Sequence, residues 1–176
     1  RERALIESKL EALAIQAQSS LSREYTKTIK GNGDAQFFHS LEQVSIGRSG
    51  YIFVLDTESH AYLFSKDSSY DGTVFAGAMN VDGKDITSEI FEAVENLSYG
   101  ETHVVSFYRS EVGFEKPREQ MIAFTYLESA HAIIGALSYY SDFQSTDLRW
   151  ILQDELRSRM TSRTIGENGY IWAVDG

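Results

Sequence analysis

The chain has 176 residues, of which 42% are apolar and 12% aromatic, so its size and composition predict one domain with a hydrophobic core rather than a disordered segment. The formal charge of -10 argues against nucleic acid as a partner, because phosphate binding needs clustered lysine and arginine. Cysteine is absent, which excludes disulfides, zinc thiolate sites and cysteine nucleophiles.

Residues 1–30 predict one long amphipathic helix. Its apolar side chains recur every three or four positions, at Ile6, Leu10, Leu13, Ala17, Leu21, Tyr25 and Ile29. The glycine- and asparagine-containing residues 31–33 are typical of a helix end, and a short amphipathic segment follows at about 35–45. A helix of this length either braces a domain or forms a seam between two copies of the chain.

The remainder of the chain alternates runs of strands with helices. A β-type run at 51–56 and a second at 61–65 predict a hairpin. After a polar loop at 66–83, Asp85 or Thr87 is expected to cap a helix that Gly100 ends. Further elements are expected as strands at 102–109, 120–127 and 132–140 and a helix at 146–163. Runs of adjacent strands predict an α+β fold with an antiparallel sheet.

Residues 46–56 are repeated near the end of the chain. Ile46-Gly-Arg-Ser-Gly-Tyr-Ile-Phe-Val-Leu-Asp56 and Ile165-Gly-Glu-Asn-Gly-Tyr-Ile-Trp-Ala-Val-Asp175 share six identities in phase, and each copy follows a predicted helix. We therefore expect helical lead-in at 1–45, one module at 46–144, a connecting helix at 145–164 and the first strand of a second module at 165–176. An unpaired apolar strand there is expected either to fray or to pair with another chain.

The strand Gly50–Asp56 and its echo resemble the opening strand of Cache sensor domains. Ile134–Tyr139 with Asp142 is similar to the closing strand of that family, and Asn80–Lys84 with the helix after it also fits. Three departures leave the ligand open. Phe64-Ser65 stands where many members have His-Pro, Leu137 replaces a glycine, and Ala130-His131 lies where a tryptophan is common.

The resemblance implies a PAS-like, five- to six-stranded antiparallel sheet packed on the long helix, displayed outside the cytoplasmic membrane. Such domains bind small molecules and signal through flanking transmembrane helices, which this chain does not include, to a histidine kinase, chemoreceptor or diguanylate cyclase output. The repeat suggests the tandem form, with this module distal from the membrane. No cofactor is implied.

Strand alternation and the resemblance together predict a ligand pocket on one face of the sheet. The resemblance implies that Phe107, Phe124 and Tyr139 face the ligand, and Arg109 would stand at the rim, where a guanidinium can bind a carboxylate. The full candidate set is Tyr62, Phe64, Phe107, Arg109, Phe124, Tyr126, Ser138 and Tyr139. Tyr62 and Phe64 are expected to share one face, and 66–70 could form a lid. The alternatives are that Arg109 is a solvated cation at the end of the strand, that the aromatic rings are plain core, and that 66–70 is an ordinary exposed loop.

Signals for catalysis are weak. Neither a nucleophile elbow nor a phosphate-binding glycine loop occurs, and the four histidines lack metal-pair spacing. Ala78 stands where a calcium loop needs its first ligand, and the acidic residues Glu111, Glu115 and Glu119 are expected on a solvated surface. The sequence thus predicts a noncatalytic sensor, without metal, for a small carboxylate or amino acid. The alternative is a ligand-free module that forms a homodimer through the stripe of Leu10, Leu13, Ala17 and Leu21.

Overall fold

The computed structural model describes residues 2–28, 38–111 and 113–143. The chain divides into a unit of residues 1–142 and a second unit of residues 143–176, and all helices and strands below lie in the first. The expected helix end at 31–33, the helix at 146–163 and the second copy of the repeat lie outside the described residues.

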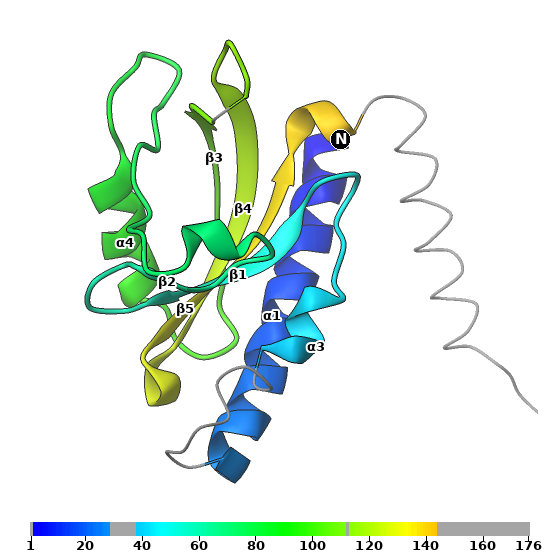
Figure 1. The fold of residues 1–176 in the computed structure, drawn as a ribbon, viewed down its shortest axis with the longest axis vertical. Helices are drawn as coiled ribbons and strands as arrows, with labels where there is room; N and C mark the ends of the chain where they lie inside the picture. The colour runs from blue at the N-terminus through cyan, green and yellow to red at the C-terminus, as the bar shows by residue number, and fades with distance from the viewer. Residues whose placement is uncertain (1, 29–37, 112, 144–176) are drawn as a thin grey trace, which may run out of the picture. The chain divides into compact units, whose positions relative to one another are not determined.

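A five-stranded antiparallel sheet forms the centre of the fold (Figure 1). Its strands are β1 (Tyr51–Asp56), β2 (Tyr62–Phe64), β3 (His103–Arg109), β4 (Arg118–Leu127) and β5 (Ala132–Tyr139), arranged in the order β2-β1-β5-β4-β3. All five are predicted from sequence within two residues, because each is rich in β-branched, aromatic and aliphatic side chains. The hairpin of β1 and β2 is confirmed, and β5 pairs with both β1 and β4.

Helix α1 (Glu2–Thr28) lies along one face of the sheet, packed against β4 and β5 (Figure 1). We call this the α1 face. The helix buries an apolar stripe made of Ile6, Leu10, Ala14, Ala17 and Leu21. Ala14 takes the place predicted for Leu13, which is only half-buried, because a helix of 3.6 residues per turn drifts between steps of three and four. The stripe that could have joined two copies is thus already covered by the sheet of its own chain.

Helix α4 (Thr87–Glu95) lies on the opposite face, which we call the α4 face (Figure 1). Its N-terminus differs from the prediction, because Ile86 precedes it without a side-chain cap. Asp85 accepts a hydrogen bond from the Thr87 backbone N at 2.8 Å, and the Thr87 hydroxyl accepts one from the Ala78 N, so both side chains hold the preceding loop. The helix ends at Glu95, and Gly100 lies in the later turn with a φ of 87°.

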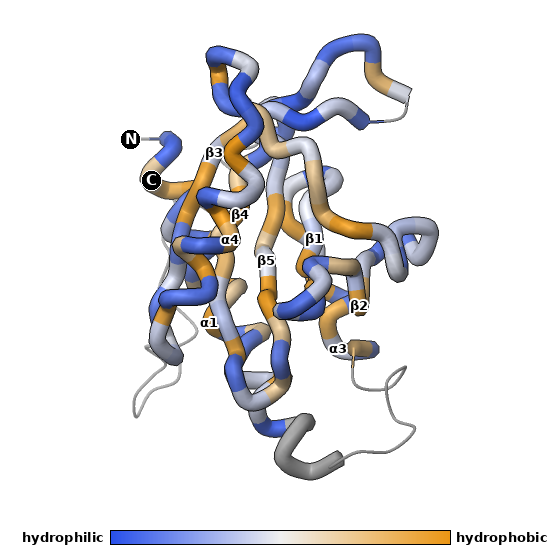
Figure 2. The backbone as a smooth tube through the Cα atoms, turned by 90° about the vertical axis from the view of Figure 1, so that its left-hand side faces the viewer, coloured by the Kyte–Doolittle hydropathy of each residue, from blue (hydrophilic) through white to orange (hydrophobic). Residues whose placement is uncertain are grey.

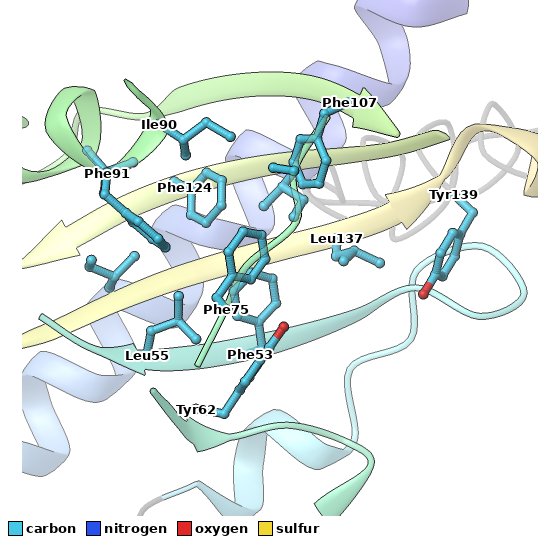
Figure 3. Close-up of a cluster of buried hydrophobic side chains, with 14 residues drawn as sticks. Phe53, Leu55, Tyr62, Phe75, Ile90, Phe91, Phe107, Phe124, Leu137 and Tyr139 are labelled. Atoms are coloured by element: carbon cyan, nitrogen blue, oxygen red, sulfur yellow. The ribbon is translucent and has the colours of Figure 1, made fainter. Parts of the chain in front are cut away.

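The α4 face carries a closed aromatic core (Figure 3). Its centre is Phe75, which is 1% exposed and comes from the loop before α4. The Phe75 ring stacks on Phe53 with centroids 5.9 Å apart and meets Phe107 and Phe124 edge-on at 6.1 Å each. Apolar residues follow the strands, while most of the connecting loops are hydrophilic (Figure 2). The middle of this face is therefore filled by the protein itself.

The remaining elements are short. Helix α3 (His39–Glu42) precedes β1, and three 3₁₀ turns follow at η1 (Ser68–Tyr70), η2 (Glu128–Ala130) and η3 (Tyr140–Asp142). Asp142 in η3 accepts hydrogen bonds from the backbone N and hydroxyl of Ser49, at 2.9 and 2.7 Å. This contact ties the end of β5 to the glycine turn before β1, the two segments that carry the family resemblance.

Candidate ligand-binding site

Polar side chains gather at one end of the α4 face. There the first residues of β1 and β4 lie beside the last residues of β3 and β5, as the pairs Arg109↔Arg118, Gln120↔Tyr139 and Tyr51↔Leu137 show. Figure 3 shows Tyr139 at this end, apart from the phenylalanine rings. We call this region the polar end; it consists of Tyr51, Tyr62, Tyr70, Arg109, Glu111, Arg118, Gln120 and Tyr139.

Arg109 is the cation of the polar end that faces the aromatic core. Its Nη1 donates a hydrogen bond to the Tyr62 hydroxyl at 3.1 Å, and its Cζ lies 4.5 Å from the centroid of the Phe75 ring. Burial raises the pKa of Tyr62, while the charge and the hydrogen bond of Arg109 lower it. Arg109 forms no salt bridge with any carboxylate among the described residues. Its position is fixed by neutral groups, so its charge stays available to an anion.

Two further tyrosines lie close to this guanidinium. The rings of Tyr62 and Tyr70 have centroids 5.5 Å apart. Burial raises the pKa of Tyr51 well above its usual range, and the nearby Tyr62 and Tyr70 raise it further. Tyr51, Tyr70 and Arg109 are only half-buried, whereas Tyr62 is buried. Because the pKa values of Tyr51 and Tyr62 are raised, these two phenols keep their protons at neutral pH and can donate hydrogen bonds to an anion.

Glu111 lies beside this group and is held by three side chains. Its carboxylate accepts hydrogen bonds from the Tyr139 hydroxyl at 2.5 Å, from Gln120 Nε2 at 2.8 Å and from Arg118 Nη1 at 3.4 Å. The Arg118 Cζ lies 3.7 Å from the centroid of the Tyr139 ring. Burial, followed by the hydrogen bond to Glu111, raises the pKa of Tyr139. The expectation of a solvated Glu111 is therefore wrong: its side chain is 12% exposed.

Glu119 is a second correction of the same kind, while Glu115 is exposed as expected. The Glu119 carboxylate accepts hydrogen bonds from Arg3 of α1 at 2.5 Å and from the Ser106 hydroxyl at 2.7 Å. The hydrogen bond to Glu119 raises the pKa of Arg3. This carboxylate has a structural role, since it links α1 to the hairpin of β3 and β4.

The predicted site residues separate into groups along the sheet. Tyr62, Arg109 and Tyr139 meet at the polar end, whereas Phe107 and Phe124 belong to the closed core around Phe75. Tyr126 packs on the same face but lies eight residues further along β4 than Arg118, roughly 27 Å at 3.4 Å per residue. A small ligand bound at Arg109 cannot reach it.

Phe64 and Ser138 lie away from the polar end. The register of β2 shifts at a bulge, so that Tyr62 pairs with Leu55 while Phe64 pairs with Val54, which points to the other face. The Phe64 ring stacks on Phe38 at 5.3 Å instead. The prediction that Tyr62 and Phe64 share a face is thus wrong. Ser138 is buried on the α1 face, as its alternation with Leu137 and Tyr139 requires.

Sequence reasoning did not find several residues of the polar end or its border. Tyr70 was included only as part of the possible lid at 66–70, whereas Phe75 comes from a loop without periodicity and Glu111 follows β3 in a charged loop. Gln120 lies inside a predicted strand, where a glutamine among apolar residues was the available signal. Tyr51 belongs to the repeated motif, and its position on the α4 face follows from alternation with Phe53.

The surface near the polar end carries two shallow grooves. One, of about 370 Å³, lies between the loop at 114–119 and Tyr140 and Ser141. The other, of about 450 Å³, lies between the turn at Met79–Gly83 and the tip of the hairpin of β3 and β4. Among the described residues, no group of three or more histidine, aspartate or glutamate side chains is arranged to hold a metal ion.

Comparison with known proteins gives the family to which this chain belongs. The Cache domain family matches residues 6–176, so this chain belongs to the Cache domain family. The sheet with its long N-terminal helix is the α+β, PAS-like architecture that the resemblance implied. No curated protein matches the sequence.

Solved structures of similar fold include chemotaxis proteins and a chemosensory domain. One is a periplasmic sensor domain of a chemotaxis protein, with a TM-score of 0.62 and 18% identity over 80% of this chain and 99% of that one. A second is a Cache chemosensory domain described for carboxylic acid recognition, with a TM-score of 0.60 and 13% identity over 76% and 92% of the two chains. A methyl-accepting chemotaxis protein from Vibrio parahaemolyticus has a TM-score of 0.58 and 14% identity over 80% and 95%. In the part of the chain that the structure describes, no helix combines the length and apolarity needed to cross a bilayer.

Proposed function

We propose that this Cache domain is the noncatalytic, extracytoplasmic sensor of a bacterial transmembrane receptor, and that it binds a small carboxylate at Arg109. The observation that carries the proposal is the guanidinium of Arg109, held by Tyr62 and Phe75 and without a salt bridge to any described carboxylate. A guanidinium offers parallel N–H donors that match a carboxylate, and the surrounding phenols add further donors. The carboxylic acid recognition described for one structure of similar fold supports the same ligand class.

The sheet offers a route from this site to helix α1. Gln120 and Tyr139 project from the α4 face of β4 and β5, and α1 packs on the opposite face of the same two strands. A ligand that favours one arrangement of the polar end will shift the population of strand positions that α1 contacts. We propose that α1 passes this shift to transmembrane helices outside this chain, and from there to a kinase, chemoreceptor or diguanylate cyclase output domain.

The repeat at 165–175 supports a tandem arrangement in which this module is the distal one. In a chain extended beyond residue 176, we expect residues 170–175 to form the first strand of a second sheet. Pairing of these residues with the sheet of β1–β5 in a structure of that longer chain would contradict the arrangement.

The ligand proposal is tested by thermal unfolding of the 176-residue chain with a panel of small carboxylates. We expect at least one carboxylate to raise the melting temperature of the wild-type protein, and Arg109→Gln to abolish the increase. Arg23→Gln is the matched control, because Arg23 is exposed on α1, away from the polar end. The proposal is wrong if no carboxylate in the panel stabilises the wild type, or if Arg109→Gln responds as the wild type does.

A further inference from the structure

Gln120 places a buried and unpartnered acceptor at the polar end. Its side chain has 0% exposure, and its strand position is opposite Phe107 on β3 and Tyr139 on β5. Its Nε2 donates a hydrogen bond to Glu111 at 2.8 Å. Its Oε1 has no hydrogen-bond partner among the described residues.

The orientation of this amide follows from its neighbour. Exchanging Nε2 and Oε1 would bring the amide oxygen against the Glu111 carboxylate, which can only accept, so the oxygen must point away from Glu111. A buried carbonyl oxygen without a donor destabilises the folded protein by about as much as a lost hydrogen bond. The other unpartnered buried atoms in the described residues are the hydroxyls of Thr57, Ser65 and Ser138, none of which belongs to the polar end. Gln120 is the member of this set that a ligand bound at Arg109 can satisfy.

Arg109 and Gln120 are close enough to share one small ligand. Phe107, the direct partner of Gln120, precedes Arg109 by two residues on the same face of β3, so Arg109 and Gln120 are diagonal neighbours. The Cα atoms of diagonal neighbours lie ~7–8 Å apart in an antiparallel pair of strands. This backbone spacing allows one small ligand to bind both side chains if its carboxylate binds Arg109 and the substituent on its neighbouring carbon reaches the buried Gln120 oxygen.

We infer that the ligand is a 2-hydroxy carboxylate, whose carboxylate binds Arg109 and whose hydroxyl donates to Gln120 Oε1; this inference rests on the proposed function. A hydroxyl fits better than an ammonium group for two reasons. Glu111, the acidic group of the polar end, already accepts from Tyr139, Gln120 and Arg118. An ammonium would also lie near the guanidinium of Arg109, which has no carboxylate partner among the described residues, whereas the neighbouring Arg118 is paired with Glu111 and Asp142.

Matched pairs of ligands test this on the wild-type chain. Calorimetric titrations compare lactate with propionate and pyruvate, and glycolate with acetate; alanine is the amino counterpart of lactate. We expect the hydroxy acid to bind about tenfold or more tightly than its partners, because only the hydroxy acid satisfies the buried acceptor. The inference is overturned if lactate binds no more tightly than propionate and glycolate binds no more tightly than acetate. Tighter binding of alanine than of lactate overturns the choice of a hydroxyl. If no carboxylate binds at all, the proposed function itself is contradicted.

Two variants connect the preference to Gln120. Gln120→Met keeps the length of the side chain but removes the acceptor, so the advantage of the hydroxy acid should disappear while binding of propionate through Arg109 remains. Ser138→Ala is the matched control, since it removes another buried unpartnered oxygen, on the α1 face of the adjacent strand. We expect Ser138→Ala to retain the tenfold preference. Persistence of that preference in Gln120→Met would overturn the inference.

Discussion

Gly135 lies directly under the ring of Phe53, its partner across β1 and β5. A Cβ atom built on Gly135 would stand 2.2 Å from the Phe53 Cζ, far inside van der Waals contact. Gly50 has an equally close environment, because a Cβ there would lie 2.4 Å from the backbone oxygens of Ile46 and Leu137. The glycines quoted in the sequence motifs are thus required by close packing at these two positions, where any side chain would displace a neighbour.

Gly135→Ala is expected to lower the free energy of unfolding by about 1–3 kcal/mol, because the added methyl group overpacks the core beneath Phe53. Urea denaturation measures the change. The double variant Phe53→Leu, Gly135→Ala should be less destabilised than the sum of the single variants, since a smaller side chain leaves room for the methyl group. Additive losses would contradict the steric explanation.

At the scale of the elements, α1 is joined to the sheet by a buried polar contact as well as by its apolar stripe. Gln18 is fully buried; its Nε2 donates to the Tyr126 carbonyl at 2.8 Å, and its Oε1 accepts from the Gly100 N at 3.2 Å. The helix therefore satisfies backbone groups both on β4 and in the turn before β3. A periodic pattern of apolar residues cannot reveal this contact, because Gln18 looks like a solvent-facing residue in the sequence.

Gln18→Leu is expected to cost about 1–3 kcal/mol of unfolding free energy, because it leaves the Tyr126 carbonyl and the Gly100 amide without their partner. Gln16→Leu, on the exposed side of α1, should change stability by less than about 0.5 kcal/mol. Guanidinium denaturation followed by circular dichroism measures both variants. Equal effects of the two substitutions would show that the contact contributes nothing.

At the scale of the whole molecule, the stripe on α1 belongs to the core of a single chain. Leu10 is 0% exposed and Leu21 1% exposed, both covered on the α1 face. If this stripe joined two copies, a partner chain would have to contact the surface that the sheet of the same chain already covers. A homodimer would have to use another surface of the domain.

Leu10→Asp is therefore expected to unfold the domain rather than to convert a dimer into a folded monomer, because it buries an unpaired charge against the sheet. Ala12→Asp, on the exposed side of the helix, should leave the fold intact. Circular dichroism and sedimentation velocity distinguish the outcomes. A monomeric Leu10→Asp protein with native circular dichroism would instead support the hypothesis that this stripe joins two copies of the chain.

The sequence itself determines the elements and much of their orientation. The strands are predicted within two residues, because a two-residue period and β-branched and aromatic content are local properties. Alternation separates the two sides within each strand, whereas the resemblance to Cache domains is what implied a common face for Phe107, Phe124 and Tyr139, which do share one cluster. The repeated motif indicates a Cache domain, and the chain belongs to that family.

Only the tertiary structure decides which of those residues can act together. The Phe75 ring closes the middle of the α4 face, a bulge turns Phe64 away, and Tyr126 lies too far along β4 to join Arg109. Glu111 and Gln120 are buried beside Tyr139 because β5 lies next to β4 in the sheet, which makes Tyr139 the direct partner of Gln120. Local periodicity determines which side of a strand a residue lies on. Its contact partners depend on residues distant in the chain, and those contacts leave Arg109 without a carboxylate and the Gln120 oxygen without a donor among the described residues.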